Sequence, residues 1–243
     1  MTRIAVISDI HGNAIALDTA LADIERVGVD QIVCLGDAIQ GGAQPAQTVA
    51  RLRDLACPVV MGNADAWLLS GVETGSETVT EEQEAVRQWS LAQLSDADRA
   101  YIAAFTPIVV IAVTAEQDLL CFHGSPTSFD DILLPNAPEE EYERLLGPYA
   151  SAIMCGGHTH WQQVHRLGAT FFFNPGSVGL AYNHNQPEEH FKLDPWAEYA
   201  ILSENDGALG LEFRRVPLSV DAVRQALRAS GRPGAEAFLT QYE

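Results

Sequence analysis

Side chains that can bind metal ions are concentrated in five short motifs of this chain, and each motif follows an apolar run typical of a buried strand. The motifs are Asp9-Ile10-His11, Gly36-Asp37, Gly62-Asn63-Ala64-Asp65, Phe122-His123-Gly124 and Gly157-His158-Thr159-His160. In open α/β sheets, ligands bind outside the carboxyl ends of the strands. The mixture of imidazole and carboxylate groups suits transition metals better than magnesium or calcium. The five motifs therefore predict one binuclear metal site.

Short apolar runs alternate with helical patterns in the first part of the chain. Strands are expected at residues 4–8, 31–35 and 58–61, and the stretches between them have helical periodicity. Asn13 is a suitable N-cap for the first helix, and Pro45 fits the first turn of the second. This βαβαβ order predicts parallel pairing of the strands that carry the first motifs.

The rest of the chain is predicted to mix helices and strands. Residues 66–105 are interpreted as a helical insertion, a last helix is expected at about 220–229, and strands are expected at 108–113, 118–122, 152–155, 162–167, 170–173, 196–202 and 209–216. His158 and His160 are separated by one residue, so an extended backbone would direct both imidazoles to the same side. We predict a single domain spanning residues 1–243.

The chain is acidic, and its composition is that of a globular protein. Of its 243 residues 47% are hydrophobic, and 33 Asp and Glu against 14 Lys and Arg give a formal net charge of -19. This charge disfavours long nucleic acids as partners, whereas bound divalent cations can reverse the local field for a small phosphorylated substrate. The four cysteines lack paired spacing and are expected to be reduced. No apolar stretch approaches the roughly 20 residues of a membrane span, so we expect a cytoplasmic protein without membrane association.

The ordered motifs resemble those of the calcineurin-like metallophosphoesterase family. The resemblance rests on Asp-Ile-His-Gly-Asn from Asp9, Gly-Asp from Gly36, Gly-Asn from Gly62, His-Gly at His123 and Gly-His-Thr-His from Gly157. The segment from Asn174 to Gly179 extends it and is similar to the compact, phosphodiesterase-like bacterial and archaeal branch. The resemblance implies an α/β fold, a four-layer αββα sandwich of two mixed β-sheets flanked by helices.

The resemblance also implies a role for each ligand. Asp9, His11 and His160 would hold a first metal, Asn63, His123 and His158 would hold a second, and Asp37 would bridge the two. The expected cofactors are two divalent transition-metal ions, drawn from manganese, iron, zinc, nickel and cobalt. Two such ions can activate a bridging hydroxide for in-line attack at phosphorus. Asp37, Asn63 and His158 are accordingly predicted to take part in catalysis, the hydrolysis of small phosphodiesters, nucleotides or phosphoanhydrides.

Two positions depart from the family pattern. Ala64 replaces a histidine that is thought to assist the leaving group in many members, and Gln40-Gly41 stands where the family often has an acid and an arginine before the glycine. A missing general acid costs on the order of 10²–10⁴ in rate, so we predict a preference for good leaving groups. His184 and His190, in an irregular stretch, are alternative proton donors, and the reading of each as an ordinary surface histidine has at least equal weight.

Three further polar residues are predicted to support the site or to contact the substrate: Asn13, Asp65 and Ser177. Asp65 is either a support for a neighbouring ligand or an acid stabilised in the first turn of a helix. Two other functions stay open, a non-catalytic protein-interaction scaffold of the same fold and a nuclease. The complete ligand set counts against the scaffold, and the acidic balance counts against the nuclease. The sequence leaves the physiological substrate, the metal identity and the oligomeric state open.

Overall fold

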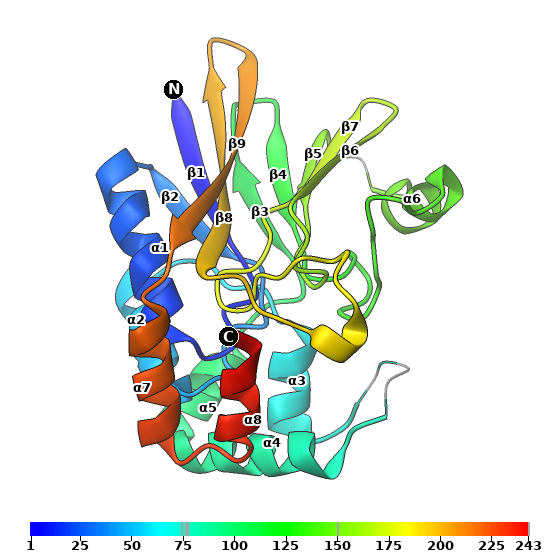
Figure 1. Cartoon of the computed structure of the whole chain (residues 1–243). Coiled ribbons are helices and arrows are strands. Elements are labelled where there is room, and N and C mark those ends of the chain that lie inside the picture. The colour runs from blue at the N-terminus through cyan, green and yellow to red at the C-terminus, as the bar shows by residue number, and fades with distance from the viewer. Residues whose placement is uncertain (74, 76–77, 150, 243) are drawn as a thin grey trace.

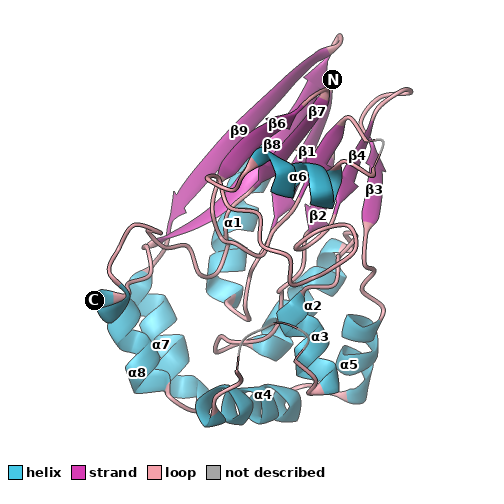
Figure 2. Ribbon diagram, turned by 90° about the vertical axis from the view of Figure 1, so that its right-hand side faces the viewer, coloured by secondary structure: helices cyan, strands magenta, loops and turns pink. Residues whose placement is uncertain are grey.

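The computed structural model describes residues 1–73, 75, 78–149 and 151–242 and contains two packed β-sheets (Figure 1). In chain order the elements are β1 (Thr2–Ile7), α1 (Ala14–Val27), β2 (Gln31–Cys34), α2 (Pro45–Leu55), α3 (Asn63–Ser70), α4 (Glu81–Gln93), α5 (Asp96–Ala103), β3 (Val109–Ala112), β4 (Asp118–Cys121), α6 (Glu139–Leu146), β5 (Ile153–Cys155), β6 (Gln163–Leu167), β7 (Thr170–Asn174), η1 (Glu188–His190), β8 (Trp196–Asn205), β9 (Ala208–Pro217), α7 (Val220–Ser230), α8 (Ala235–Leu239) and η2 (Thr240–Tyr242). Figure 2 shows that the strands occupy one end of the molecule and that α3, α4, α5, α7 and α8 gather at the other.

Both sheets mix parallel and antiparallel pairs. The first has the strand order β2-β1-β8-β9, in which β1 is parallel to β2 and antiparallel to β8. The second has the order β3-β4-β5-β7-β6, in which β5 is parallel to both β4 and β7. Four of the five predicted metal-ligand motifs follow β1, β2, β4 and β5. They therefore leave the sheets at the carboxyl ends of parallel strands.

The alternation of side chains along each strand explains the layers. Ile4 of β1 packs into the core between the two sheets, whereas the next residue, Ala5, packs into the core formed with α1 and α2. In β4, Leu119 faces the inter-sheet core and Leu120 faces the core formed with α6. Successive residues of a strand point to opposite faces, so central strands such as β1 and β4 are buried on both faces. The predicted αββα sandwich of two mixed sheets is confirmed.

The prediction of a strand at residues 58–61 is wrong, because these residues form only isolated bridges. Val59 forms an isolated parallel bridge with Cys34, and Val60 forms another with Thr106. Pro58 has no N–H to contribute to a ladder, and helix α3 begins directly after Gly62. The segment therefore forms one bridge on each side in place of a ladder, although it still delivers Asn63 to the same end of the molecule.

The helices follow their sequence signals closely at the N-terminal side. The Asn13 side chain accepts a hydrogen bond from the Ala16 N–H and caps α1, and Pro45 is the first residue of α2. Helix α7 confirms the prediction at 220–229, whereas α8 and η2 were not predicted. Helices α3, α4 and α5 cover much of the predicted insertion at 66–105, of which residues 74 and 76–77 lie outside the described residues. The single-domain organisation stays a prediction.

Among the described helices, none has both the length and the apolar character that crossing a bilayer requires.

Candidate metal centre and active site

Six of the predicted metal ligands form two neighbouring groups at the carboxyl ends of the parallel strands. One group consists of Asp9, His11 and His160, and the other consists of Asp37, His123 and His158. Within each group the candidate ligand atoms all lie within 4.8 Å of one another. Segments separated by about 150 positions in the chain are therefore brought together as the motif order predicted. Each group contains the nitrogen and carboxylate donors that divalent transition metals prefer.

Asp37 belongs to the second group and also lies close to the first. Its Oδ2 atom is 3.4 Å from His123 Nε2 in its own group and 3.8 Å from His11 Nε2 in the other. The Asp37 Oδ1 atom instead accepts a hydrogen bond from the Ala64 N–H. Asn63, the seventh predicted ligand, places its Oδ1 atom 3.0 Å from His123 Nε2. These positions suit the predicted bridging role of Asp37 and the predicted grouping of Asn63.

Backbone carbonyl groups orient three of the histidines. The Nδ1 atoms of His11, His123 and His160 lie 2.9, 2.8 and 2.9 Å from the carbonyl oxygens of Gln40, Leu35 and Leu180. A carbonyl oxygen only accepts, so each Nδ1 carries the hydrogen and each Nε2 faces the centre. Such carbonyl partners are the usual way in which proteins fix the tautomer of a metal-binding histidine. The His11 and His160 Nε2 atoms are 3.1 Å apart, a spacing that favours a shared cation.

The electrostatics of the second group also favour a cation. Burial acts to raise the pKa of Asp37, but the nearby histidines, His123 first, outweigh it and lower that pKa. Burial acts to lower the pKa of His123, but the charge of Asp37 outweighs it and raises that pKa to about 9. A buried carboxylate is thus held ionised by a neighbouring positive charge. A divalent ion can provide the same charge at this place.

One buried carboxylate oxygen tests whether a metal fits the first group. Asp9 is fully buried, and its Oδ2 atom accepts a hydrogen bond from the His158 backbone N–H. Its Oδ1 atom accepts no hydrogen bond in the described part of the chain, although it lies 3.3 Å from His160 Nε2. Leaving a buried carboxylate oxygen without a partner is costly. An ion held between Asp9, His11 and His160 would satisfy it, so the donor set fits a metal.

The backbone at the ligands is strained. In the described chain, five of the seven non-glycine residues with positive φ are predicted ligands, namely Asp9, His11, Asp37, His158 and His160. Such conformations cost of order 1–3 kcal/mol each and cluster at functional sites. The φ angles of His158 and His160 are 69° and 55°, so the expectation of an extended segment there is wrong. The two imidazoles lie in different ligand groups, His160 with Asp9 and His158 with Asp37, which is the grouping that the resemblance implies.

Two glycines allow the ligand loops to approach closely. A Cβ atom at Gly62 would lie 2.1 Å from Asp37 Oδ1, and one at Gly157 would lie 2.1 Å from Ser8 Oγ and 3.0 Å from Asp9 Oδ2. A larger residue would displace Asp37 at the first position and Ser8, next to Asp9, at the second. These contacts explain why a glycine precedes Asn63 and His158 in the two motifs.

The three predicted supporting residues hold the ligand loops. Asp65 is fully buried, and its carboxylate accepts hydrogen bonds from the N–H groups of Ala38 and Ile39, directly after Asp37. Burial and then the charge of Asp37 raise the pKa of Asp65 to about 7. The Ser177 hydroxyl donates to the Asp9 carbonyl, and the Asn13 amide donates to the Gly179 carbonyl. All three residues hold backbone segments next to the predicted ligands in place through hydrogen bonds.

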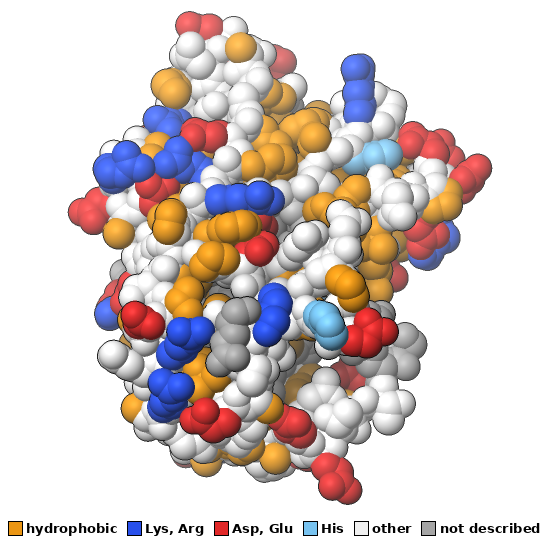
Figure 3. Space-filling view, viewed as in Figure 1, with side chains coloured by type: hydrophobic (Ala, Val, Ile, Leu, Met, Phe, Trp, Pro, Cys, Tyr) orange, Lys and Arg blue, Asp and Glu red, His pale blue; other side chains and the backbone are white. Residues whose placement is uncertain are grey.

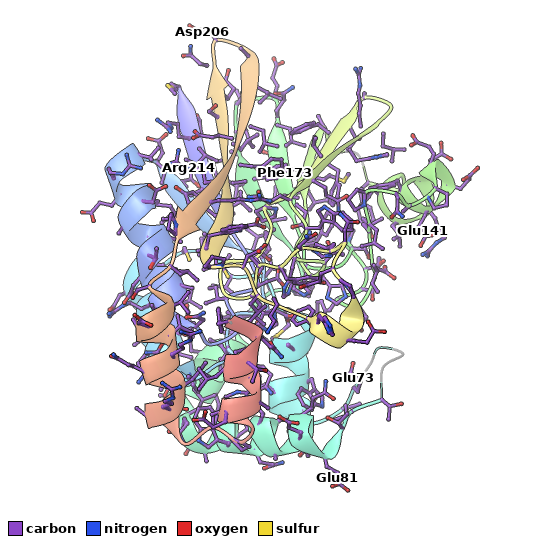
Figure 4. The ribbon with its side chains drawn as sticks, viewed as in Figure 1. Glu73, Glu81, Glu141, Phe173, Asp206 and Arg214 are labelled. Atoms are coloured by element: carbon purple, nitrogen blue, oxygen red, sulfur yellow. The ribbon has the colours of Figure 1, made fainter. Side chains whose placement is uncertain are left out.

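A pocket of about 440 Å³ opens beside the predicted ligands. Glu73, which Figure 4 labels on the segment between α3 and α4, is one of its lining residues. His11, Asn63 and Ala64 are among its lining residues. Ala64 therefore lines this pocket with a methyl group. Many family members have a histidine at this position, which could act as a general acid. Arg232 and Phe238 also line this pocket, from the C-terminal end of the chain. The five motifs give no indication of these two residues, and no local sequence pattern marks either of them as part of the pocket.

The two proposed proton donors lie elsewhere. His184 lines a separate pocket of about 330 Å³ beside the ligand His160, stacks on Trp161 at 4.2 Å, and places its Nε2 atom 3.2 Å from the His160 carbonyl oxygen. Burial lowers the pKa of His184. His190 is exposed in η1. Neither is among the described residues that line the pocket at Ala64, so their role in proton transfer stays a prediction.

Comparison with known proteins identifies the family. Residues 2–193 match the model of the calcineurin-like phosphoesterase superfamily domain. The chain belongs to this superfamily. An uncharacterized protein of Methanocaldococcus jannaschii is 50% identical to the chain, with 84% of each sequence covered. Calcineurin-like phosphoesterase membership and the two ligand groups together support a metal-dependent phosphoesterase.

Solved structures show the same fold. A metallophosphoesterase from Sphaerobacter thermophilus is 23% identical, covers 99% of this chain and 97% of its own, and superposes with a TM-score of 0.74. A hypothetical protein from Pyrococcus horikoshii is 18% identical, covers 98% of each chain, and gives a TM-score of 0.82. These bacterial and archaeal proteins share the architecture of this calcineurin-like phosphoesterase along almost its whole length.

Proposed function

We propose that this protein uses two divalent transition-metal ions to hydrolyse small phosphodiesters, nucleotides or phosphoanhydrides. The observation that carries the proposal is the pair of adjoining ligand groups, with Asp37 in the second group and close to the first. The buried Asp9 Oδ1 atom, which accepts no hydrogen bond from the described chain, supports a cation there. Such ions would lower the pKa of water and stabilise the attacking and leaving oxygens of an in-line displacement.

Each ligand has a defined part in this proposal. Asp9, His11 and His160 would hold one ion, Asn63, His123 and His158 would hold the other, and Asp37 would bind both. The carbonyl groups of Gln40, Leu35 and Leu180 keep three of the imidazoles aimed at the ions. Asp65 holds the backbone that follows Asp37. The side chains are thus positioned before substrate binds, which reduces the reorganisation needed in the transition state.

The pocket restricts which substrates are expected to react well. Ala64 contributes a methyl group to the pocket wall and has no proton to donate. Leaving groups that depart as stable anions, such as aryl oxides and phosphates, need no such proton. We therefore propose phosphoanhydrides, aryl esters and activated diesters as better substrates than simple alkyl monoesters.

The test combines metal analysis with a substrate screen. The protein loaded with each metal is assayed against cyclic nucleotides, dinucleoside polyphosphates, aryl diesters and monoesters. We expect two ions per chain, and we expect Asp37→Asn to loosen both ions and to remove most of the turnover. Asp18→Asn, the same atomic change at an exposed carboxylate paired with Arg51, is the control and should retain both properties. Full turnover by Asp37→Asn with both ions bound would contradict the assignment.

The screen also addresses the two alternative functions. A chain that binds two ions but turns over no substrate with any metal favours a non-catalytic scaffold. Salt-sensitive binding of single-stranded nucleic acid by the metal-loaded protein favours a nuclease.

A further inference from the structure

Arg232 lies in the turn between α7 and α8, and its side chain reaches the loop of Gln40 and Gly41. The Gln40 carbonyl of this loop orients His11. Its Nε atom donates to the Gly41 carbonyl oxygen at 2.6 Å, and its Nη1 atom donates to the Pro233 carbonyl oxygen at 2.7 Å. Its guanidinium carbon is 4.7 Å from the centre of the Phe238 ring. These contacts fix the plane of the guanidinium group and leave Nη2 with no hydrogen bond to the described part of the chain.

Arg232 differs from most arginines of this chain in having no acidic partner. Arg26, Arg51, Arg53, Arg87, Arg99, Arg144, Arg214, Arg215, Arg224 and Arg228 all lie within 4.0 Å of a carboxylate oxygen. In the described chain, no carboxylate lies within this distance of Arg232 although its side chain is partly buried. Burial acts to lower the pKa of Arg232, and the charge of Glu82 acts in the opposite direction. A half-buried guanidinium without an anion is a ready binding group for one.

The position of Arg232 places this cation beside the metal ligands. Arg232 lines the same pocket as His11 and Asn63, and it is the only Lys or Arg among the described residues that line it. The residue it contacts, Gly41, adopts φ +121°, and a Cβ atom there would lie 3.6 Å from His11 Nδ1. Position 41 itself is therefore best occupied by glycine. A cation for this side of the pocket has to come from another segment.

We propose that Arg232 binds the phosphoryl oxygens of the substrate in this pocket. The inference rests on the proposed phosphoesterase function and identifies a substrate-binding residue that the five motifs do not contain. Arginine suits this role because its planar guanidinium donates several hydrogen bonds to phosphate at once. The acidic Glu73 and Glu82 line the same pocket, so Arg232 supplies the attraction that otherwise has to come from the metals alone.

The test measures binding of inorganic phosphate to the metal-loaded protein by calorimetry. Hydrogen bonds to charged groups contribute enough that Arg232→Gln should weaken phosphate binding about 10- to 100-fold. Arg232→Lys, which keeps the charge but loses the planar fork, should fall between Arg232→Gln and the wild type. Arg228→Gln is the matched control, because Arg228 is exposed, pairs with Glu236, and lies on α7, where Figure 3 shows a group of basic side chains. It should bind phosphate within about twofold of the wild type.

Three further measurements separate binding from folding and from hydrolysis. Metal content should stay at the wild-type value in all variants, and in turnover Arg232→Gln should raise KM more than it lowers kcat. A variant that melts earlier but binds phosphate normally would make Arg232 purely structural and overturn the inference. So would a metal-loaded wild type that does not bind phosphate. If phosphate binding depends on Arg232 but no phosphoester is cleaved, the hydrolysis proposal fails and the anion site stands.

Discussion

Replacing Gly62 by alanine isolates the close packing against the Asp37 carboxylate. Gly62 precedes α3 with φ −95° and ψ 165°, angles that alanine adopts without strain. The only obstacle is space, because the added Cβ would lie 2.1 Å from Asp37 Oδ1 and 2.2 Å from Asp37 N. The substitution therefore acts on the position of Asp37 and not on the backbone preference of residue 62.

The expected size of the effect follows from these distances. Ordinary contacts of a Cβ atom begin at 3.4 Å, so Asp37 or the start of α3 has to move by about 1 Å. A displacement of this size at a catalytic group can cost about 100-fold in rate. Overpacking of a tight site typically costs about 1–3 kcal/mol in the free energy of unfolding. For a chain of this length, each kcal/mol lowers Tm by about 2–4 °C.

The assay compares Gly62→Ala with Gly207→Ala. Gly207 lies in the β8–β9 hairpin turn with φ +85° and no atom within 4 Å of an added Cβ, so its substitution strains the backbone without touching the site. Gly62→Ala should bind both metals more weakly and hydrolyse an aryl diester about 100-fold more slowly. Gly207→Ala should lose about 1–2 kcal/mol of stability and keep wild-type metal affinity and turnover. Wild-type affinity for two ions in Gly62→Ala would refute the close-packing argument.

Two further predictions concern the leaving group and the buried ion pair. Ala64→His should raise kcat for alkyl monoesters by about tenfold or more and leave kcat for aryl substrates nearly unchanged. An equal change for both classes, measured across a series of leaving-group pKa values, would contradict the inference that Ala64 leaves the site without a general acid. Asp23 of α1 bonds to the Tyr199 hydroxyl and to Arg214, which Figure 4 labels on β9. Burial acts to raise the pKa of Asp23, but these partners and Arg26 outweigh it and lower that pKa. The ionised Asp23 therefore stabilises the folded state above about pH 4. This contribution to folding stability is lost as the pH falls through the lowered pKa. In urea unfolding, Asp23→Asn should lower the free energy of unfolding by about 2–4 kcal/mol at pH 7 and by less below pH 4. The control Asp18→Asn, at an exposed carboxylate, should lower it by at most about 1 kcal/mol. Equal losses for Asp23→Asn at both pH values would disprove the linkage between its pKa and folding.

Features set by local sequence could be predicted. The continuous apolar run from Ile4 to Ile7 in β1 indicates a strand buried on both faces, and Asn13 marks the start of α1, because both signals act over a few residues. The order of the motifs also anticipated that Asp9 and His160 would meet. That prediction depends on the rule that ligands gather at the carboxyl ends of parallel strands.

Features set by distant contacts could not be predicted. The strand expected at 58–61 is reduced to two bridges because its partners are Cys34 and Thr106, and no local pattern reveals that choice. The left-handed backbone at His158 and His160 likewise depends on packing against other loops. Arg232 reaches Gly41 across 191 positions in the chain. A lone arginine in a turn carries no sign of such a contact.

We propose that seven side chains of this chain hold two divalent ions. Anomalous diffraction from crystals of the manganese-loaded protein would locate these ions. We expect two peaks, one among Asp9, His11 and His160 and the other among Asn63, His123 and His158, with Asp37 contacting both ions. A single peak, or peaks bound through other residues, would contradict it.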